Sequence, residues 1–146
     1  MADTSLGFRY RGRMGEAPNP TIQMLVSKET IVHTKGDLLM LDGVTGEVLI
    51  AATDSKVIVG VCAETVSCTD SVTKVAVITD EDAFYAVYDA NARHINAPLD
   101  IAGATGAMTV AADSNHDLLV IAESSATEET LVMVKHGAYF ANVTIT

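Results

Sequence analysis

Residues 41–52 read LDGVTGEVLIAA, and residues 101–112 read IAGATGAMTVAA. Gly, Thr, Gly, Ala and Ala coincide between the two stretches without a gap. Each stretch places glycine and other turn-forming residues before a run of β-branched and small apolar side chains, which is the pattern of a turn leading into a strand. This repeated stretch predicts that one β unit is used twice.

The similarity extends outward from both copies. Each copy continues through an Asp-Ser turn (54–55 or 113–114) to three further elements: an apolar strand at 57–61 or 118–121, another at 75–77 or 132–134, and an aromatic pair within 84–86 or 139–141. The predicted copies cover residues 36–88 and 97–145. Neither unit could bury its apolar face alone, so they should pack as two halves of one sandwich or barrel. Chance convergence of β-turn sequences is the alternative.

Short runs rich in Val and Ile alternate with clusters of Gly, Asp, Asn and Ser along the rest of the chain, which is typical of strands and turns. The predicted strands are 24–26, 38–41, 47–51, 57–62, 72–78, 84–88, 107–111, 118–122, 131–135 and 139–145. Only 79–92 could be helical, because Asp80-Glu81-Asp82 would suit a first helical turn; a strand at 84–88 is preferred. We therefore expect an all-β fold, a compact β-sandwich or small barrel with two related halves.

Composition is that of one globular domain. The 146 residues are 49% hydrophobic and 19% charged, and they contain no Trp. A formal net charge of -10 repels phosphate backbones, so we expect no nucleic-acid partner. No stretch approaches the length of an apolar membrane span, so we expect no membrane partner either.

Residues 1–24 differ from the remainder. They contain several glycines and two prolines, and they hold three of the nine basic residues as alternating arginines, Arg9, Arg11 and Arg13. Glycine and proline at this density disfavour a helix. We predict an extended N-terminal arm at 1–24, ordered only where something holds it, followed by a single β domain at 25–146. A plain flexible tail is the alternative.

Catalytic and metal-binding motifs are not recognisable. Cys62 and Cys68 do not form a CxxC pair, and the histidines (His33, His94, His116 and His136) do not make a sequence-local ligand set. The acidic run Asp80-Glu81-Asp82 lacks the spaced ligands of a calcium loop and is expected to be a solvated loop. We therefore expect no enzyme activity, no cofactor and no metal, although ligands from distant loops remain an alternative.

Three short motifs follow one another between residues 35 and 64: Lys35-Gly36-Asp37-Leu38, then Ala52-Thr53-Asp54-Ser55-Lys56, then Val59-Gly60-Val61-Cys62-Ala63-Glu64. Over about residues 30–65 the chain resembles bacteriophage head decoration, or cement, proteins. The resemblance implies a compact β protein that forms a homotrimer and binds the major capsid protein on the outer capsid surface. It also implies a location in the virion after assembly in the host cytoplasm, and it carries no catalytic residues.

Many members of that family engage the shell through an N-terminal arm. The residues matching this arm make Phe8, Arg9, Tyr10, Arg11 and Arg13 the predicted capsid-binding residues. The alternative function is a tail or fibre accessory module that recognises a host surface glycan or protein. An enzyme with a metal or carboxylate site built from loops is the third class.

Overall fold

The computed structural model describes residues 7–15, 19–28, 31–42, 45–51, 58–69, 73–80, 82–103, 106–112, 117–125 and 128–134. This part of the chain is all-β, compact and sandwich-like, which confirms the predicted fold class. The helical alternative for 79–92 is wrong, because Ala83–Asp89 is a strand with buried residues on one face. The strand predicted at 139–145 lies outside the described residues.

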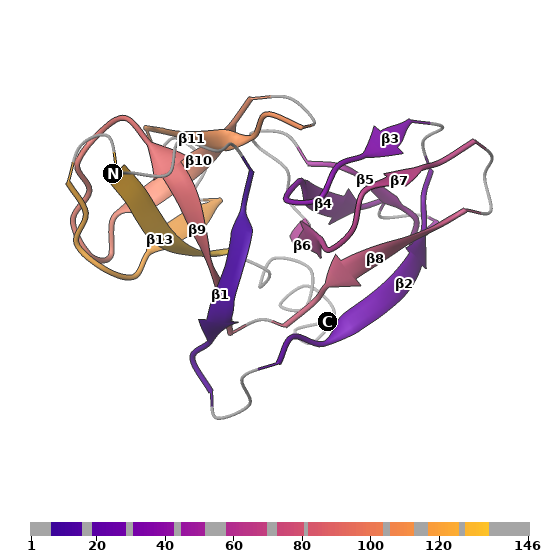
Figure 1. The fold of residues 1–146 in the computed structure, drawn as a ribbon, viewed down its shortest axis with the longest axis horizontal. Coiled ribbons are helices and arrows are strands. Elements are labelled where there is room, and N and C mark those ends of the chain that lie inside the picture. Colours follow the sequence, from indigo (N-terminus) through magenta and orange to yellow (C-terminus); the bar gives the residue numbers. More distant parts are fainter. Residues whose placement is uncertain are drawn as a thin grey trace, which may run out of the picture.

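Two antiparallel sheets divide the chain (Figure 1). A two-stranded ladder joins β3 (Val32–His33) to β7 (Val66–Ser67). The first sheet, which we call the first unit, has the order β2-β8-β6-β4-β5 and contains β2 (Ile22–Val26), β4 (Leu38–Leu41), β5 (Val48–Ile50), β6 (Ile58–Cys62) and β8 (Lys74–Ile78). The second sheet has the order β1-β9-β13-β12-β10-β11 and contains β1 (Arg9–Arg13), β9 (Ala83–Asp89), β10 (Pro98–Ala102), β11 (Thr109–Ala112), β12 (Leu118–Val120) and β13 (Glu128–Val134).

Strands β9 to β13, which we call the second unit, repeat the strand order of the first unit. When the five strands of each unit are numbered along the chain, both sheets have the order first, fifth, fourth, second, third. Within the matching hairpins, Leu39 and Leu99 are both buried, and Gly46 and Gly106 have φ angles of 74° and 77°. This left-handed conformation suits glycine, so Gly46 and Gly106 adopt the same backbone conformation at corresponding positions of the two units.

The unit boundaries differ from those predicted from sequence. The sequence match placed residues 84–88 at the end of the first copy, but β9 pairs with β13 and is the first strand of the second unit. The first unit correspondingly begins with β2 and not at residue 36. A strand joins the sheet that offers it a free edge, and neighbours in sequence do not decide that choice.

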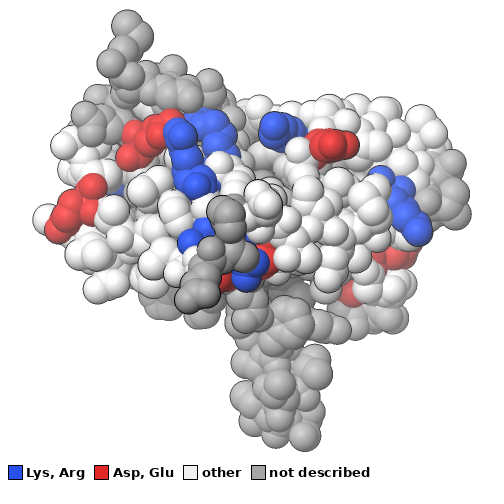
Figure 2. Space-filling model, turned by 60° about the horizontal axis from the view of Figure 1, so that its bottom comes forward, with Lys and Arg blue, Asp and Glu red and all other residues white. Residues whose placement is uncertain are grey.

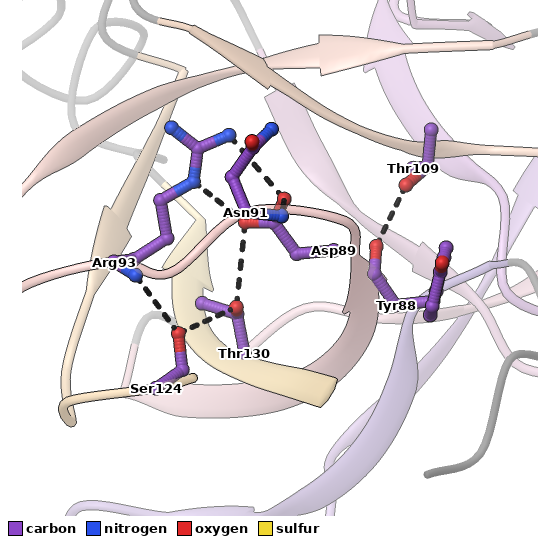
Figure 3. Close-up of polar contacts among 7 residues, drawn as sticks. All are labelled: Tyr88, Asp89, Asn91, Arg93, Thr109, Ser124 and Thr130. Carbon is purple, nitrogen blue, oxygen red and sulfur yellow. Dashed lines mark hydrogen bonds and ion pairs between the residues drawn. The ribbon is translucent and has the colours of Figure 1, made fainter. Parts of the chain in front are cut away.

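Both units curl until their first strand approaches their third. In the first unit, Ser27 bridges Val48 beyond the end of β2, and the Lys28 amide donates to the Val48 carbonyl at 2.9 Å. In the second unit, Thr109 Oγ1 on β11 donates to the Tyr88 carbonyl on β9 at 2.7 Å (Figure 3). Closure of this kind leaves few exposed strand edges.

The central strands of the first unit's sheet are buried on both faces. Successive strand residues point to opposite faces, and Leu38 and Leu39 are both fully buried, as are Val77 and, nearly, Ile78. Leu39 and Val77 belong to a smaller core inside the first unit, whereas Leu38 and Ile78 join the larger core that includes the second unit. The continuous apolar runs in the sequence therefore reflect two-sided burial.

The expected N-terminal arm is a strand of the body. Arg9–Arg13 pairs antiparallel with β9, and the Gly7 amide donates to the Met108 carbonyl at 2.7 Å. Phe8 is only 2% exposed and belongs to the larger core. The predicted boundary at residue 24 also falls within β2. The described part of 1–24 is extended, but β9 holds it because β9 offers a free edge and the Phe8 ring gains from burial.

A buried ion pair ties the loop after β9 to β13 (Figure 3). Asp89 is 2% exposed and accepts from Arg93 Nε at 2.6 Å and from the Asn91 amide at 3.0 Å. Thr130 Oγ1 lies 3.4 Å from the same carboxylate and 3.1 Å from Ser124 Oγ. These contacts satisfy a carboxylate that would otherwise be costly to bury.

Replacing Asp89 with Ala should lower the free energy of unfolding by about 3–5 kcal/mol, because Arg93 would stay largely buried without its counter-ion. Urea denaturation measures the change. Glu123→Ala is the control, since the Glu123 side chain is 64% exposed, and it should cost less than about 1 kcal/mol. Equal effects of the two substitutions would contradict a structural role for this ion pair.

Phe8→Ala should lower the free energy of unfolding by about 3–5 kcal/mol, as large-to-small changes in cores do. Arg11→Ala on the same strand should cost less than about 1 kcal/mol, because surface ion pairs contribute little. Thermal or urea unfolding compares the two variants. If Phe8→Ala is as stable as the unmodified chain, the N-terminal residues are an independent arm after all.

Candidate functional site

A groove of about 550 Å³ runs between β1 and the ends of β6 and β8. Its lining comes from three separate parts of the sequence: Gly7, Phe8, Arg9, Tyr10, Lys35, Gly36, Val61, Cys62, Ala63 and Ile78. The floor is apolar, and Arg9 and Lys35 supply cationic groups. An apolar groove with a few charged groups is the usual composition of a recognition site.

Close backbone packing holds β1 beside the first unit. The Phe8 amide donates to the Gly36 carbonyl, and the Gly36 amide donates to the Cys62 carbonyl, both at 2.9 Å. Gly36 has a φ of 97°, and a Cβ there would stand 3.2 Å from the Phe8 nitrogen. A side chain at Gly36 would therefore be strained and crowded, so glycine lets β1 lie against the first unit.

Arg9 and Arg11 contact the same carboxylate. Arg9 Nη2 lies 2.7 Å from Glu129 Oε1, and Arg11 Nη2 lies 2.9 Å from Glu129 Oε2. The Arg11 side chain remains 47% exposed, against 26% for Arg9 and 24% for Glu129. Two guanidinium groups thus share one carboxylate.

Arg13 contacts the acidic run before β9. Arg13 Nε donates to Asp82 Oδ1 at 2.8 Å, and Arg13 Nη1 lies 3.5 Å from Asp80 Oδ1. Asp80 is 8% exposed and also accepts from the Thr21 amide. The expectation of a solvated acidic loop is therefore wrong for Asp80, which is buried between β1 and β2; Glu81 lies outside the described residues.

Basic side chains lie beside acidic ones on the face drawn in Figure 2. The alternating arginines do not form an isolated basic patch, because the acceptors described above belong to the same chain. Sequence pattern indicated a basic segment free to meet acidic surfaces elsewhere. In the structure, Arg9 and Arg11 pair with Glu129, and Arg13 pairs with Asp82. These ion pairs neutralise much of the positive charge and link β1 to neighbouring parts of the same chain.

Local electrostatics follow from these contacts. The hydrogen bond from Arg13 lowers the pKa of Asp82 and raises the pKa of Arg13 itself. Burial raises the pKa of Tyr10, and the nearby Asp80 carboxylate adds to this increase. Burial also raises the pKa of the Cys62 thiol to about 11, so this groove residue is neutral at pH 7.

The Ser27–His33 pair and the two cysteines are enclosed in the core. Ser27 Oγ lies 2.7 Å from His33 Nε2, but both residues are fully buried, so a substrate could not reach this pair. Cys62 and Cys68 are free and buried. Within the described ranges, no group of three or more His, Cys, Asp or Glu side chains is placed to hold a metal ion.

Three of the five predicted partner-binding residues line the groove. Phe8 does so with a buried ring, Arg9 and Tyr10 are partly exposed, and Arg11 and Arg13 lie on β1 outside the lining. Sequence reasoning did not assign Lys35 or Ala63 to the site, although both belong to the motifs quoted between residues 35 and 64. Glu129 carries no local signal, because only the pairing of β13 with β9 brings it near the arginines.

No protein-family model matches the chain, and no curated protein sequence matches it significantly. In the part of the chain that the structure describes, no helix has the length and apolar character needed to cross a membrane. The fold and the groove define an all-β protein of two units with the same strand order and a groove at the junction between β1 and the first unit.

Stability should depend on the ionisation of Asp82. Because its pKa is lowered in the folded state, its contribution is present above the ordinary value of 3.8 and is lost as the pH falls through the lower folded value. Asp82→Asn should therefore be less stable at neutral pH, and its deficit should shrink on acidification. Urea denaturation across this pH range tests it, with Glu64→Gln as the control because Glu64 is exposed; a deficit that stays constant with pH would contradict the assignment.

Proposed function

We propose that this chain is a non-enzymatic structural protein, a bacteriophage capsid decoration protein. It binds the outer surface of the major capsid protein lattice as a homotrimer and stabilises the head in the virion. The observation that carries the proposal is the composition of the groove. Lys35-Gly36 and Val61–Ala63, from either end of the resembling stretch, meet Phe8, Arg9 and Tyr10 from the predicted contact segment.

Recognition at this groove would combine apolar contact with charge. Phe8, Val61 and Ile78 supply an apolar floor, and Arg9 and Lys35 favour acidic groups on the shell. Partly exposed charges are screened by salt, so attachment should weaken as ionic strength rises. The net charge of -10 favours solubility before assembly.

Trimerisation would add avidity to a groove of modest size. Once one chain of a trimer is bound, the others meet the lattice at a high effective concentration, so individually weak contacts give lasting attachment. A lattice offers repeated copies of one surface, and a symmetric oligomer matches this repetition.

Native mass and co-sedimentation test the proposed function directly. The purified protein should have the mass of three chains and should pellet with heads assembled from the major capsid protein encoded in the same genome, at a fixed ratio. A monomer that remains in the supernatant, with binding to host glycans, would overturn the proposal in favour of the tail or fibre module.

Substitutions in the groove test whether it is the surface that contacts the capsid. Ala63→Arg places a long side chain in the lining and should reduce co-sedimentation by roughly tenfold, the scale of losing a well-packed contact. Lys35→Glu should also reduce co-sedimentation, and the attachment that remains should depend less on salt concentration than that of the unmodified chain. Ile95→Arg is the control, because Ile95 is 51% exposed and does not line the groove. Normal attachment of both groove variants, with unchanged melting temperatures, would exclude the groove as the contact.

A further inference from the structure

The open edge of β2 corresponds to the edge of β9 that β1 covers. β9 is the first strand of the second unit, and its outer edge pairs with β1. β2 is the first strand of the first unit and, among the described residues, is the terminal strand of its sheet (Figure 1). Within the described ranges, the two units therefore differ in whether an added strand is present.

The ladders show which residues are equivalent in the two units. Leu39 and Leu99 match in sequence and are both buried. Following the pairings across each sheet from these two residues gives further equivalent positions: Gly60 and Leu118, Cys62 and Val120, Val77 and Val132, Lys74 and Glu129, and Val26 and Tyr88.

The buried polar pairs confirm this equivalence independently. Ser27 follows Val26, and Asp89 follows Tyr88; both are buried and both bond to a residue in the next segment. The partner of Ser27 is His33, and the partner of Asp89 is Arg93. The same position thus carries a buried polar anchor in each unit.

Ile22 and Met24 are apolar but exposed at the positions that β1 covers in the second unit. Their equivalents are Phe84 and Ala86, which pair with Gly12 and Arg9 of β1. Ala86 is fully buried, whereas Ile22 and Met24 are 50% and 56% exposed. Edge strands in free proteins usually carry a charge or a proline, and β2 reads IQMLV.

Backbone groups at this edge are oriented to receive a strand. The Thr79 amide donates to the Thr21 carbonyl, and the Ser27 amide donates to the Thr73 carbonyl. Odd-numbered residues of β2 therefore bond to β8, and the alternation of an antiparallel ladder turns the amide and carbonyl groups of Ile22 and Met24 toward the open edge.

The charge beside the two edges is reversed. In the second unit, Glu129 on β13 accepts Arg9 and Arg11 of the added strand. Its equivalent in the first unit is Lys74 on β8, which is exposed. An added strand that makes the corresponding contact must carry acidic side chains where β1 carries arginines.

We infer that the edge of β2 at Ile22–Val26 is a binding site for an extended, acidic strand of a partner polypeptide, which adds to the sheet by β-augmentation. Main-chain hydrogen bonds would come from Ile22 and Met24, and Lys74 would select acidic side chains. The site goes beyond the proposed function, because it follows from the duplicated strand order and the exposed edge and does not require a capsid.

Two peptides and the isotopically labelled full chain test the inference by NMR titration. The first peptide has the sequence of residues 7–15 with its three arginines replaced by glutamate, and the second is the unmodified sequence. The acidic peptide should bind more tightly, by roughly fivefold, and should shift the amide signals of Ile22–Val26. Lys74→Glu should reverse the preference, and added salt should reduce it.

Edge variants separate strand addition from simple charge attraction. Met24→Pro removes an amide that faces the open edge while keeping the bonds to β8, and it should weaken acidic-peptide binding by roughly tenfold. Met24→Thr keeps the amide and is the matched control. Failure of the acidic peptide to bind, a preference that Lys74→Glu leaves unchanged, or equal binding by the two Met24 variants would each overturn the inference.

Discussion

Burial of the central strands of the first unit on both faces is the constraint on which the rest of the structure depends. Leu39 and Val77 fill the interior of the first unit, while Leu38 and Ile78 on the other face need a second apolar surface to cover them. The second unit and Phe8 provide that surface. Because strand residues alternate between faces, an apolar run in the middle of a sheet requires a layer on each side, and a single unit supplies only one.

Strand β1 connects this constraint to the candidate site. It covers the free edge of β9, contributes Phe8 to the larger core and forms one wall of the groove. Its arginines are held by Glu129 and Asp82 of the second unit, so the charge that would suit a long flexible arm instead fixes the strand in place. A partner would therefore meet a preformed surface and would not have to order a flexible segment, which lowers the entropic cost of binding.

Duplication also gives the two units different chemistry at equivalent positions. The buried anchor is a hydroxyl–imidazole contact in the first unit, Ser27 with His33, and an ion pair in the second, Asp89 with Arg93. Lys74 stands where the second unit has Glu129. Among the strands that the structure describes, none covers the edge of β2 beside Lys74, whereas β1 covers the edge of β9 beside Glu129. A repeated fold keeps its packing, while its edges and charges are free to diverge because they lie outside the shared core.

The sequence by itself determined the all-β class, most of the strands and the existence of two related halves. These properties depend on local alternation, turn residues and a repeated Thr-Gly, which act over a few residues. Only the tertiary structure decided that residues 9–13 are a paired strand and that β9 belongs to the second unit. It also placed Lys35 and Ala63 in the groove beside β1, and Glu129 against Arg9. The local pattern of β1 is compatible with an arm or a strand. The choice depends on the free edge of β9, whose paired residues lie 70 to 77 positions away along the chain, and on an apolar core to which both units contribute.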